Sequence, residues 1–167
     1  VIQAIVNNLS PLLFARFSVQ FGIAEWQLTL IVFLNFAIQI VVDSSSAIIA
    51  TKLGYRLSTI IAQSCSALGL IFLGVLPHCM PPYAGILIAT FFMAVGGGFV
   101  EVVLSPLIEA LPLKNKSGAM CFLHSFYCWW HIFVVLSATL FFNVFSIDNW
   151  MYLPIILAVL PVLNSIL

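Results

Sequence analysis

Long uninterrupted runs of apolar residues are the feature that most restricts how this chain can fold. A bilayer core is crossed by a helix of about 20 apolar residues, and the runs here are continuous rather than alternating, which disfavours an outer-membrane barrel. Charged residues make up 6% of the 167 residues and hydrophobic residues 63%, whereas soluble domains carry about 25% charged residues. The sequence therefore predicts an all-α, polytopic integral membrane protein.

Polar and turn-forming residues divide the chain into about six predicted membrane-spanning helices. These lie near residues 1–21, 26–51, 55–76, 82–111, 117–145 and 150–167. The first and the last reach the two ends of the chain. We therefore expect the chain to begin inside one helix and to end inside another, as a piece of a longer protein.

Basic residues in the loops predict an orientation. Lys52 and Arg56 fall in the second connection, and Lys114 and Lys116 fall in the fourth. Because cytoplasmic loops carry an excess of lysine and arginine, we expect both of these connections and both ends of the segment in the cytoplasm, in a multi-pass protein of the plasma (inner) membrane. The net charge is zero, which gives no indication of a nucleic-acid partner.

A short internal repeat predicts how the helices are related. The string LSPL occurs at Leu9–Leu12 in the first predicted helix and at Leu104–Leu107 in the fourth. The two copies are three helices apart in the order of the chain, so these two helices cross the membrane in opposite directions, as inverted-topology repeats require. We predict two three-helix units, about residues 1–76 and 82–167, with the proline of each copy interrupting its helix. A four-residue identity in a leucine-rich chain also arises by chance.

Glu101 stands out because membrane helices rarely contain an acid. It lies in GGGFVEVVLSPLIEALP, residues 96–112, among glycines and large apolar residues. An acid near the bilayer centre costs about 2.5–3.5 kcal/mol on insertion scales and is a candidate for function. Gly97 and Ser105 share its helical face, and glycine allows close helix approach. We interpret Glu101 as a proton-coupling carboxylate or, alternatively, as a structural acid hydrogen-bonded to another helix.

Two further acids lie in or near the predicted helices. Asp43, with Gln39 and the serines that follow it, makes the inner half of the second helix polar. That indicates either a pore-facing patch or a contact between helices. Glu109 lies near the face of Glu101 but close to the basic fourth connection, where we expect a solvated interfacial acid.

The segment HSFYCWWH places two histidines on one face of the fifth helix. His124 and His131 are seven residues apart, about two turns, with Tyr127 and Cys128 between them. A proton relay or solute-binding face beside Glu101 is one interpretation, because histidine titrates near neutral pH. Packing against neighbouring helices is the other, and the spacing matches no metal-binding motif, so we predict no metal site. The other candidate solute-binding residues are Asn7, Asn8, Trp129 and Trp130.

Six helices with short loops, polar first and fourth helices, and third and sixth helices without acids resemble the amino-terminal half of a major facilitator superfamily transporter. The resemblance implies that the first helix of each unit lines a central cavity and that the third lies outside. The family's loop motif, G-x-L-x-D-R-x-G-R-K, would fall on residues 47–56, AIIATKLGYR, with Ala47 and Thr51 where the motif has Gly and Asp. The usual charge relay of that loop is therefore not expected. The candidate gating or helix-contact residues are Asp43, Lys52, Gly54, Arg56 and Glu109.

Within this superfamily, a glycine-rich fourth helix with a membrane-embedded Glu resembles the fucose-proton symporter branch and its sugar-porter relatives. Glu101 is at the matching position, which implies a role in proton coupling. The acid that this branch carries in its first helix has no counterpart, because Asn7 and Asn8 occupy the polar stretch.

The expected function is secondary active transport of a small polar solute across the lipid bilayer. Proton-coupled sugar uptake by alternating access, together with a carboxy-terminal half of the same transporter, is the first candidate, and proton-coupled efflux of a metabolite or drug is the alternative. We expect no cofactor and no enzymatic activity. A rhomboid-like protease needs G-x-S-G, and the nearest string, NKSG at Asn115–Gly118, lacks the first glycine. A non-transporting membrane assembly partner is the remaining alternative.

Overall fold

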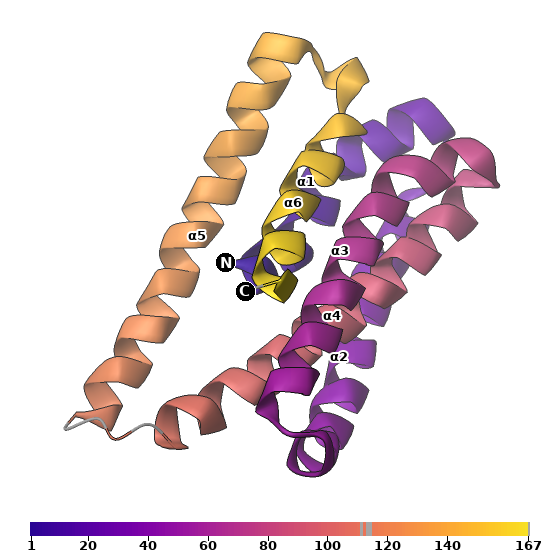
Figure 1. Ribbon diagram of the computed structural model, residues 1–167. Helices are drawn as coiled ribbons and strands as arrows, with labels where there is room; N and C mark the ends of the chain where they lie inside the picture. The colour runs from indigo at the N-terminus through magenta and orange to yellow at the C-terminus, as the bar shows by residue number, and fades with distance from the viewer. Residues whose placement is uncertain (111, 113–114, 167) are drawn as a thin grey trace.

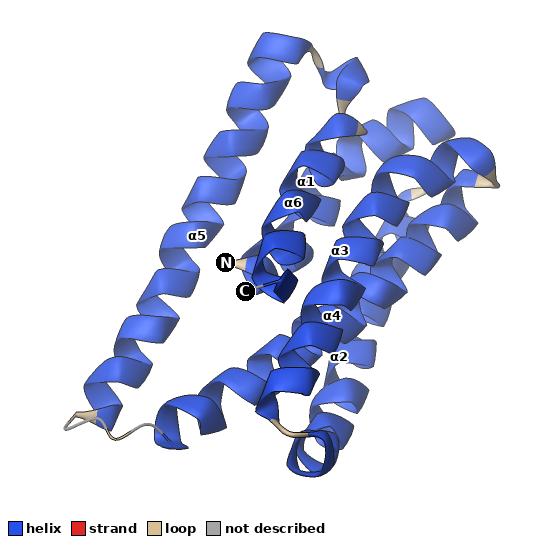
Figure 2. Ribbon diagram, in the orientation of Figure 1, coloured by secondary structure: helices blue, strands red, loops and turns tan. Residues whose placement is uncertain are grey.

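The computed structural model shows a chain built of helices (Figures 1 and 2). It describes residues 1–110, 112 and 115–166, without the side chains of residues 46–51, 105, 107, 109 and 110. Its elements are α1 (Ile2–Phe21), α2 (Glu25–Leu53), α3 (Tyr55–Cys79), α4 (Pro82–Ala110), α5 (Lys116–Phe145), the 3-10 helix η1 (Ile147–Asn149) and α6 (Tyr152–Ile166). No strand occurs in this part of the chain, which confirms the predicted all-α class.

Four helices in the described part of the chain are long and apolar enough to cross a membrane. The spans are Glu25–Ser45, Tyr55–Cys79, Pro82–Leu104 and Lys116–Phe145. They agree with the prediction of an integral membrane protein. Helix α1 has 20 residues but carries several polar side chains, and α6 has 15 residues. Membrane crossing by these two helices remains a prediction.

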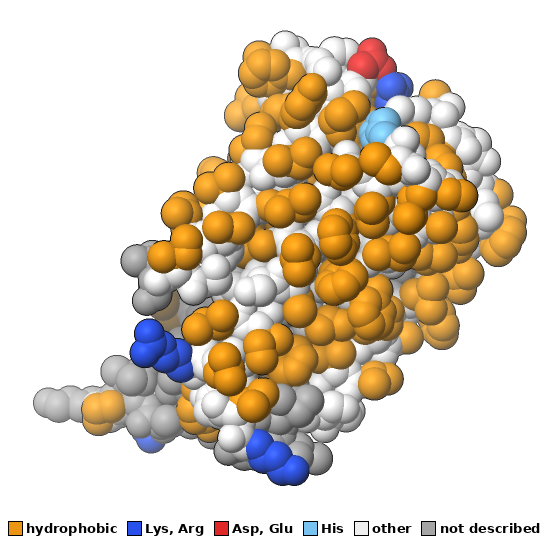
Figure 3. All heavy atoms as spheres, turned by 45° about the vertical axis from the view of Figure 1, so that its right-hand side comes forward, with side chains coloured by type: hydrophobic (Ala, Val, Ile, Leu, Met, Phe, Trp, Pro, Cys, Tyr) orange, Lys and Arg blue, Asp and Glu red, His pale blue; other side chains and the backbone are white. Residues whose placement is uncertain are grey.

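The distribution of side chains on the surface also fits a membrane protein. Figure 3 shows apolar side chains over the middle of the visible face. Lysine and arginine side chains gather toward the lower end, and an acid, a base and a histidine lie close together near the upper end. An apolar belt between two polar ends is the arrangement that a bilayer requires.

Close packing of α3 against α4 forms the centre of the bundle, with α2 on α4 and α6 on α3. Glycines make this approach possible. A Cβ atom on Gly69 would lie 2.6 Å from the backbone nitrogen of Met93, and one on Gly96 would lie 2.7 Å from that of Ser66 and 2.8 Å from the carbonyl oxygen of Ala62. A side chain at either glycine would push the two helices apart.

Helices α1 and α4 continue through the prolines of the LSPL repeat, Pro11 and Pro106. The expectation that these prolines interrupt their helices is therefore corrected. A membrane helix tolerates an internal proline where neighbouring groups satisfy the freed backbone carbonyl. Figure 1 shows the last turns of α4 running sideways toward the start of α5.

Helices α5 and α2 are the least covered of the four candidate spans. In the apolar spans, 11% of α5 and 22% of α2 is buried, against 44% of α3 and 50% of α4. This differs from the expectation that the acid-free third helix lies outside, because α4 and α6 both pack on α3. Helix α5 stands at the edge of the bundle, where its main contact is α1 (Figure 1).

A polar and aromatic cluster joins α1 to the connection between α5 and α6. Nη2 of Arg16 donates a hydrogen bond to Oδ1 of Asp148, and its Nε donates to Oε1 of Gln20 at 3.1 Å. The same Gln20 oxygen accepts a hydrogen bond of 2.7 Å from Nε1 of Trp150. The indole of Trp150 is completely buried and packs edge-on against Phe17. Arg16 is thus held by partners at this end of the bundle.

Candidate functional site

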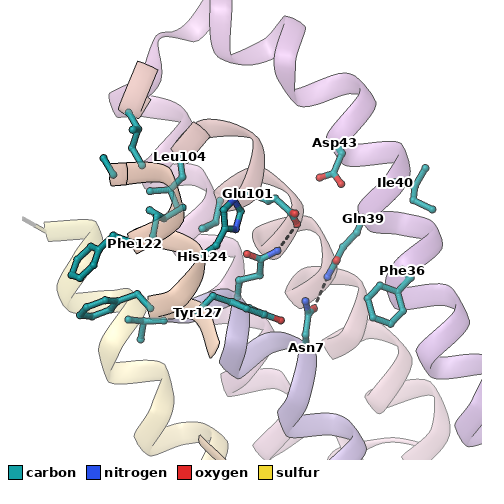
Figure 4. Close-up of a pocket in the computed structure, with 17 residues that line it drawn as sticks. Asn7, Phe36, Gln39, Ile40, Asp43, Glu101, Leu104, Phe122, His124 and Tyr127 are labelled. Atoms are coloured by element: carbon teal, nitrogen blue, oxygen red, sulfur yellow. Dashed lines mark hydrogen bonds between the residues drawn. The ribbon is translucent and has the colours of Figure 1, made fainter. Parts of the chain in front are cut away.

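Five of the predicted site residues meet in one cavity, which we call the acid cavity (Figure 4). They are Asn7, Asp43, Glu101, His124 and Tyr127. The cavity has a volume of about 810 Å³ and lies between α1, α2, α4 and α5. This volume is in the range of small-molecule binding sites. The polar side chains that line it are Gln3, Asn7, Gln39, Asp43, Glu101, His124 and Tyr127.

Glu101 projects from α4 into the acid cavity and is held there by a neutral donor. Nε2 of Gln3, on α1, donates a hydrogen bond to Oε2 of Glu101 (Figure 4). The carboxylate also stays exposed to the cavity. Glu101 therefore has the hydrogen bond of a structural acid and the access that proton exchange needs.

Two glycines next to Glu101 bring the backbone of α4 close to α2. A Cβ atom on Gly97 would lie 3.3 Å from Nε2 of Gln39, and one on Gly98 would lie 3.0 Å from Oδ1 of Asp43. Asp43 and Glu101 both line the acid cavity. Two negative charges in one cavity attract cations, including the proton.

Three amides connect α1 to α2 at the wall of the cavity. Oδ1 of Asn7 accepts hydrogen bonds from Nε2 of Gln39 at 2.7 Å and from Nδ2 of Asn35 at 3.4 Å. Asn35 and Gln39 are 7% and 5% exposed. Because buried amides need partners, these bonds fix how α1 and α2 face each other.

Gln3 is a residue of this site that the sequence motifs above do not identify. A simple spacing does identify it. Gln3 precedes Asn7 by four residues, and Asn35, Gln39 and Asp43 follow one another at intervals of four. Residues four apart lie on the same helical face, and Gln3 and Asn7 of α1 and Gln39 and Asp43 of α2 all line the cavity.

Helix α5 contributes to two different contacts. His124 and Tyr127 line the acid cavity. Nδ1 of His131 instead lies 3.2 Å from Nδ2 of Asn8, and its ring meets Tyr127 edge-on with centroids 6.0 Å apart. The structure therefore places Asn8 and His131 in the contact between α1 and α5, behind the residues that line the cavity.

The two tryptophans predicted as solute-binding residues do not line the acid cavity. Trp129 is 70% exposed, and Trp130 packs against Phe133 with ring centroids 4.8 Å apart. Consecutive helix residues point about 100° apart, so the face that carries Tyr127 leaves Trp129 on the outside of the bundle. A role for either tryptophan in solute binding stays a prediction.

The turn between α2 and α3 holds the predicted gating residues Lys52, Gly54 and Arg56, all exposed. Gly54 has a φ of +81°, which favours glycine over any residue with a side chain. The side chains of Ser105 and Glu109 lie outside the described part of the chain. Among the residues that the structure describes, no three His, Cys, Asp or Glu side chains are grouped so that they could hold a metal ion.

Comparison with known proteins identifies no relative of this chain. No protein-family model matches it, and no curated protein or solved structure shows significant similarity. A functional assignment therefore depends on the residues of the acid cavity and on the arrangement of the helices around it.

Proposed function

We propose that this chain is the amino-terminal six-helix half of a secondary active transporter of the major facilitator type. Its solute is small and polar, and a sugar taken up with a proton is the first candidate. The observation that carries the proposal is the position of Glu101, an acid inside an apolar bundle that lines a cavity of about 810 Å³. In this proposal Glu101 binds and releases the coupled proton.

The pairing of the helices supports two inverted three-helix units. If α1, α2 and α3 exchange with α4, α5 and α6, the contact of α1 with α5 becomes the contact of α4 with α2, and both contacts occur. The contacts of α1 with α4 and of α3 with α6 map onto themselves, and they also occur. An exchange of the two three-helix units reproduces these contacts, whereas the extensive contact of α3 with α4 has only the small contact of α1 with α6 as its counterpart.

A second pair of short strings agrees with the same exchange. LGVLP, Leu73–Pro77, lies in α3, and LAVLP, Leu157–Pro161, lies in α6. Each string has a small residue at its second position. A Cβ atom on Gly74 would lie 2.8 Å from Cγ1 of Ile155, which shows how closely the two helices pack at this residue.

The open side of the acid cavity supports the proposal that a carboxy-terminal half covers it. The rim of this side carries large apolar side chains of α2 and α5 that are between 49% and 66% exposed, namely Phe36, Ile40, Phe122 and Phe126. A second half of the same chain would cover them and close the cavity. Rocking of the two halves then exposes the solute to each side of the membrane in turn.

The basic residues support an orientation for this half. Lys52 and Arg56 lie at the α2–α3 turn, and Lys116 begins α5. Under the positive-inside tendency, this end faces the cytoplasm, and both ends of the segment do so too. The plasma membrane is the location that we propose.

Efflux of a cationic metabolite or drug is the second candidate, and charge favours it. Asp43 and Glu101 both line the acid cavity, and no lysine or arginine lines it within the described part of the chain. Phe122, Phe126 and Tyr127 add aromatic rings, whose faces attract organic cations. Exchange of such a cation for protons uses the same carboxylate.

Proton movement tests the proposal directly. We would express the full-length protein in energised cells and record external pH while adding a panel of sugars, for the wild type, Glu101→Gln and Glu25→Gln. Glu25 is an exposed acid in the first turn of α2 and serves as the matched control. We expect alkalinisation with one sugar in the wild type and the control, and its loss in Glu101→Gln.

The other outcomes separate the alternatives. Proton movement driven by organic cations, and by none of the sugars, would replace uptake by efflux. A protein that moves no proton with either class of solute would contradict proton-coupled transport and favour the assembly-partner alternative.

A further inference from the structure

A hydrogen bond between α1 and α5 determines where the proton of a histidine ring lies. Nδ2 of Asn8 donates a bond of 2.7 Å to the carbonyl oxygen of Ala4. The same nitrogen lies 3.2 Å from Nδ1 of His131. Because a carbonyl oxygen can only accept, the group of Asn8 that faces it is the amide NH2, and the second hydrogen of this group points to His131.

The ring of His131 fits this contact only in its neutral form. An amide nitrogen does not accept hydrogen bonds, so Nδ1 of His131 is the acceptor and carries no proton. The proton of the neutral ring is then on Nε2, whereas in the charged ring both nitrogens are donors. Turning the Asn8 amide over would offer its oxygen to a charged ring. The same turn would place that oxygen against the carbonyl oxygen of Ala4.

No carboxylate is among the partners of His131 in the described part of the chain. These partners are Asn8 and the ring of Tyr127, which it meets edge-on. Helix α5 packs mainly on α1 and makes smaller contacts with α4 and η1. The charged groups of those elements with described side chains bond to other residues, and they are Arg16 of α1, Glu101 of α4 and Asp148 of η1. A proton on Nδ1 would therefore meet only the donor of Asn8.

His131 lies where the surroundings of α5 change. The part of α5 that lines the acid cavity lies before it, between Ala119 and Tyr127. The two buried residues of α5, Val134 and Ala138, follow it on the same helical face. Little of the span is buried, so few apolar contacts hold the cavity-lining half in place. The bond to Asn8 joins α5 to α1 at the boundary between these two halves.

We infer that His131 is a positioning residue for the acid cavity, and that a proton on its Nδ1 releases the cavity-lining half of α5 from α1. The neutral ring accepts the bond from Asn8 and holds residues 116–130 against the bundle. The charged ring turns one donor toward another, and the contact opens. Histidine changes its charge between about pH 5 and pH 8, so the contact is complete at the upper end of this range and lost toward the lower end. The inference concerns the cavity wall and does not rest on the proposed transport.

The ring nitrogens of His131 test the inference directly. We would record NMR spectra of the full-length protein in lipid nanodiscs, with the histidine nitrogens isotopically labelled, and identify His131 by the signals that His131→Gln removes. At about pH 8 we expect Nδ1 to carry no proton. Asn8→Leu should shift the Nδ1 signal of His131 and leave that of His124, an exposed histidine of the same helix, unchanged. A proton on Nδ1 at this pH, or a signal that Asn8→Leu does not move, would overturn the inference.

Distances between spin labels test the release of α5. In protein whose native cysteines are replaced by serine, one pair of labels joins Ser125→Cys, in the cavity-lining half of α5, to Leu57→Cys of α3. The control pair joins Leu140→Cys, in the other half of α5, to Val75→Cys of α3, and all four positions are exposed. On lowering the pH from about 8 to about 5, we expect the distances of the first pair to broaden and those of the control pair to stay the same.

His131→Gln separates this contact from other groups that titrate. The glutamine oxygen accepts a bond from Asn8 at every pH, so neither pair of labels should respond to pH in this variant. Equal broadening in His131→Gln and in the wild type, or no broadening in the wild type, would overturn the inference. If His131→Gln does not fold, the shift of the Nδ1 signal in Asn8→Leu decides. A pH-dependent contact in a protein that moves no proton with any solute would retain the inference and reject only the transport function.

Discussion

Oδ1 of Asn7 lies 2.7 Å from Nε2 of Gln39, and this hydrogen bond joins α1 to α2 at the wall of the acid cavity. The same oxygen accepts a longer bond from Asn35. One side chain therefore satisfies two buried amides and also lines the acid cavity. Substitution of Asn7 should therefore lower stability more than substitution of a polar residue that makes no such bonds.

We expect Asn7→Leu to lower the free energy of unfolding by about 1–3 kcal/mol, because Asn35 and Gln39 lose their acceptor while they remain buried. Asn143 is an exposed residue of α5, and Asn143→Leu should change stability by less than about 0.5 kcal/mol. Denaturant or thermal unfolding in detergent measures both. Equal effects would show that the amide cluster contributes nothing specific.

The glycines before Glu101 should differ sharply although they are neighbours. A Cβ atom on Gly96 would meet the backbone of α3 at 2.7–2.8 Å, so Gly96→Ala should cost about 1–3 kcal/mol of stability. A Cβ atom on Gly97 comes no closer than 3.3 Å to its neighbours. Gly97→Ala should cost less than Gly96→Ala, because the nearest atom is at the end of the Gln39 side chain and not in a backbone. Comparable Tm values for the two variants would contradict the close packing of α3 and α4.

In the Arg16 cluster, the buried bond should matter more than the exposed ion pair. Gln20→Leu removes the acceptor of the buried Trp150 indole and should cost about 1–3 kcal/mol. Asp148, whose side chain is 71% exposed, should lose at most about 1 kcal/mol in Asp148→Asn. Unfolding of both variants at low and high salt checks this order, and only the Asp148 contribution should fall with salt.

If Glu101 couples protons, Gln3 should set its efficiency without being essential. Gln3→Leu removes the hydrogen bond to the carboxylate. Bonds to charged groups contribute about 1.5–3 kcal/mol, so the loss of this bond should change the rate of solute-driven proton uptake, which should still remain above that of Glu101→Gln. Initial rates of external alkalinisation measure this. An unchanged rate in Gln3→Leu would show that the bond has no part in coupling.

The helices were largely predictable, because a continuous apolar run that crosses a bilayer has to satisfy its own backbone hydrogen bonds and therefore forms a helix. The fifth helix, expected at residues 117–145, extends from Lys116 to Phe145. The third, expected to end near residue 76, continues through Pro77 to Cys79. Proline disfavours the residue before it in a helix but does not forbid one further turn, so composition alone misjudges this boundary.

The acid cavity was predictable in part. Glu101, Asp43 and His124 meet there, as the polar faces indicate, because a charged or polar side chain in an apolar chain has few places to lie. The placement of His131 against Asn8 was not predictable, since helical spacing gives the face of α5 but not the helix that it meets. Which helix α5 meets depends on how the helices pack, and the spacing of residues along one helix gives no information on packing.

Two walls of the acid cavity, α1 and α2, are joined by groups that carry no charge. Asn7, Asn35 and Gln39 hold α1 to α2 through amides, and amides do not titrate at any pH at which the protein folds. Gain or loss of a proton by Glu101 therefore leaves these bonds as they are. We expect the α1–α2 wall to keep its shape while the charge inside the cavity changes. The same wall then lines the cavity when the Glu101 carboxyl is protonated and when it is ionised.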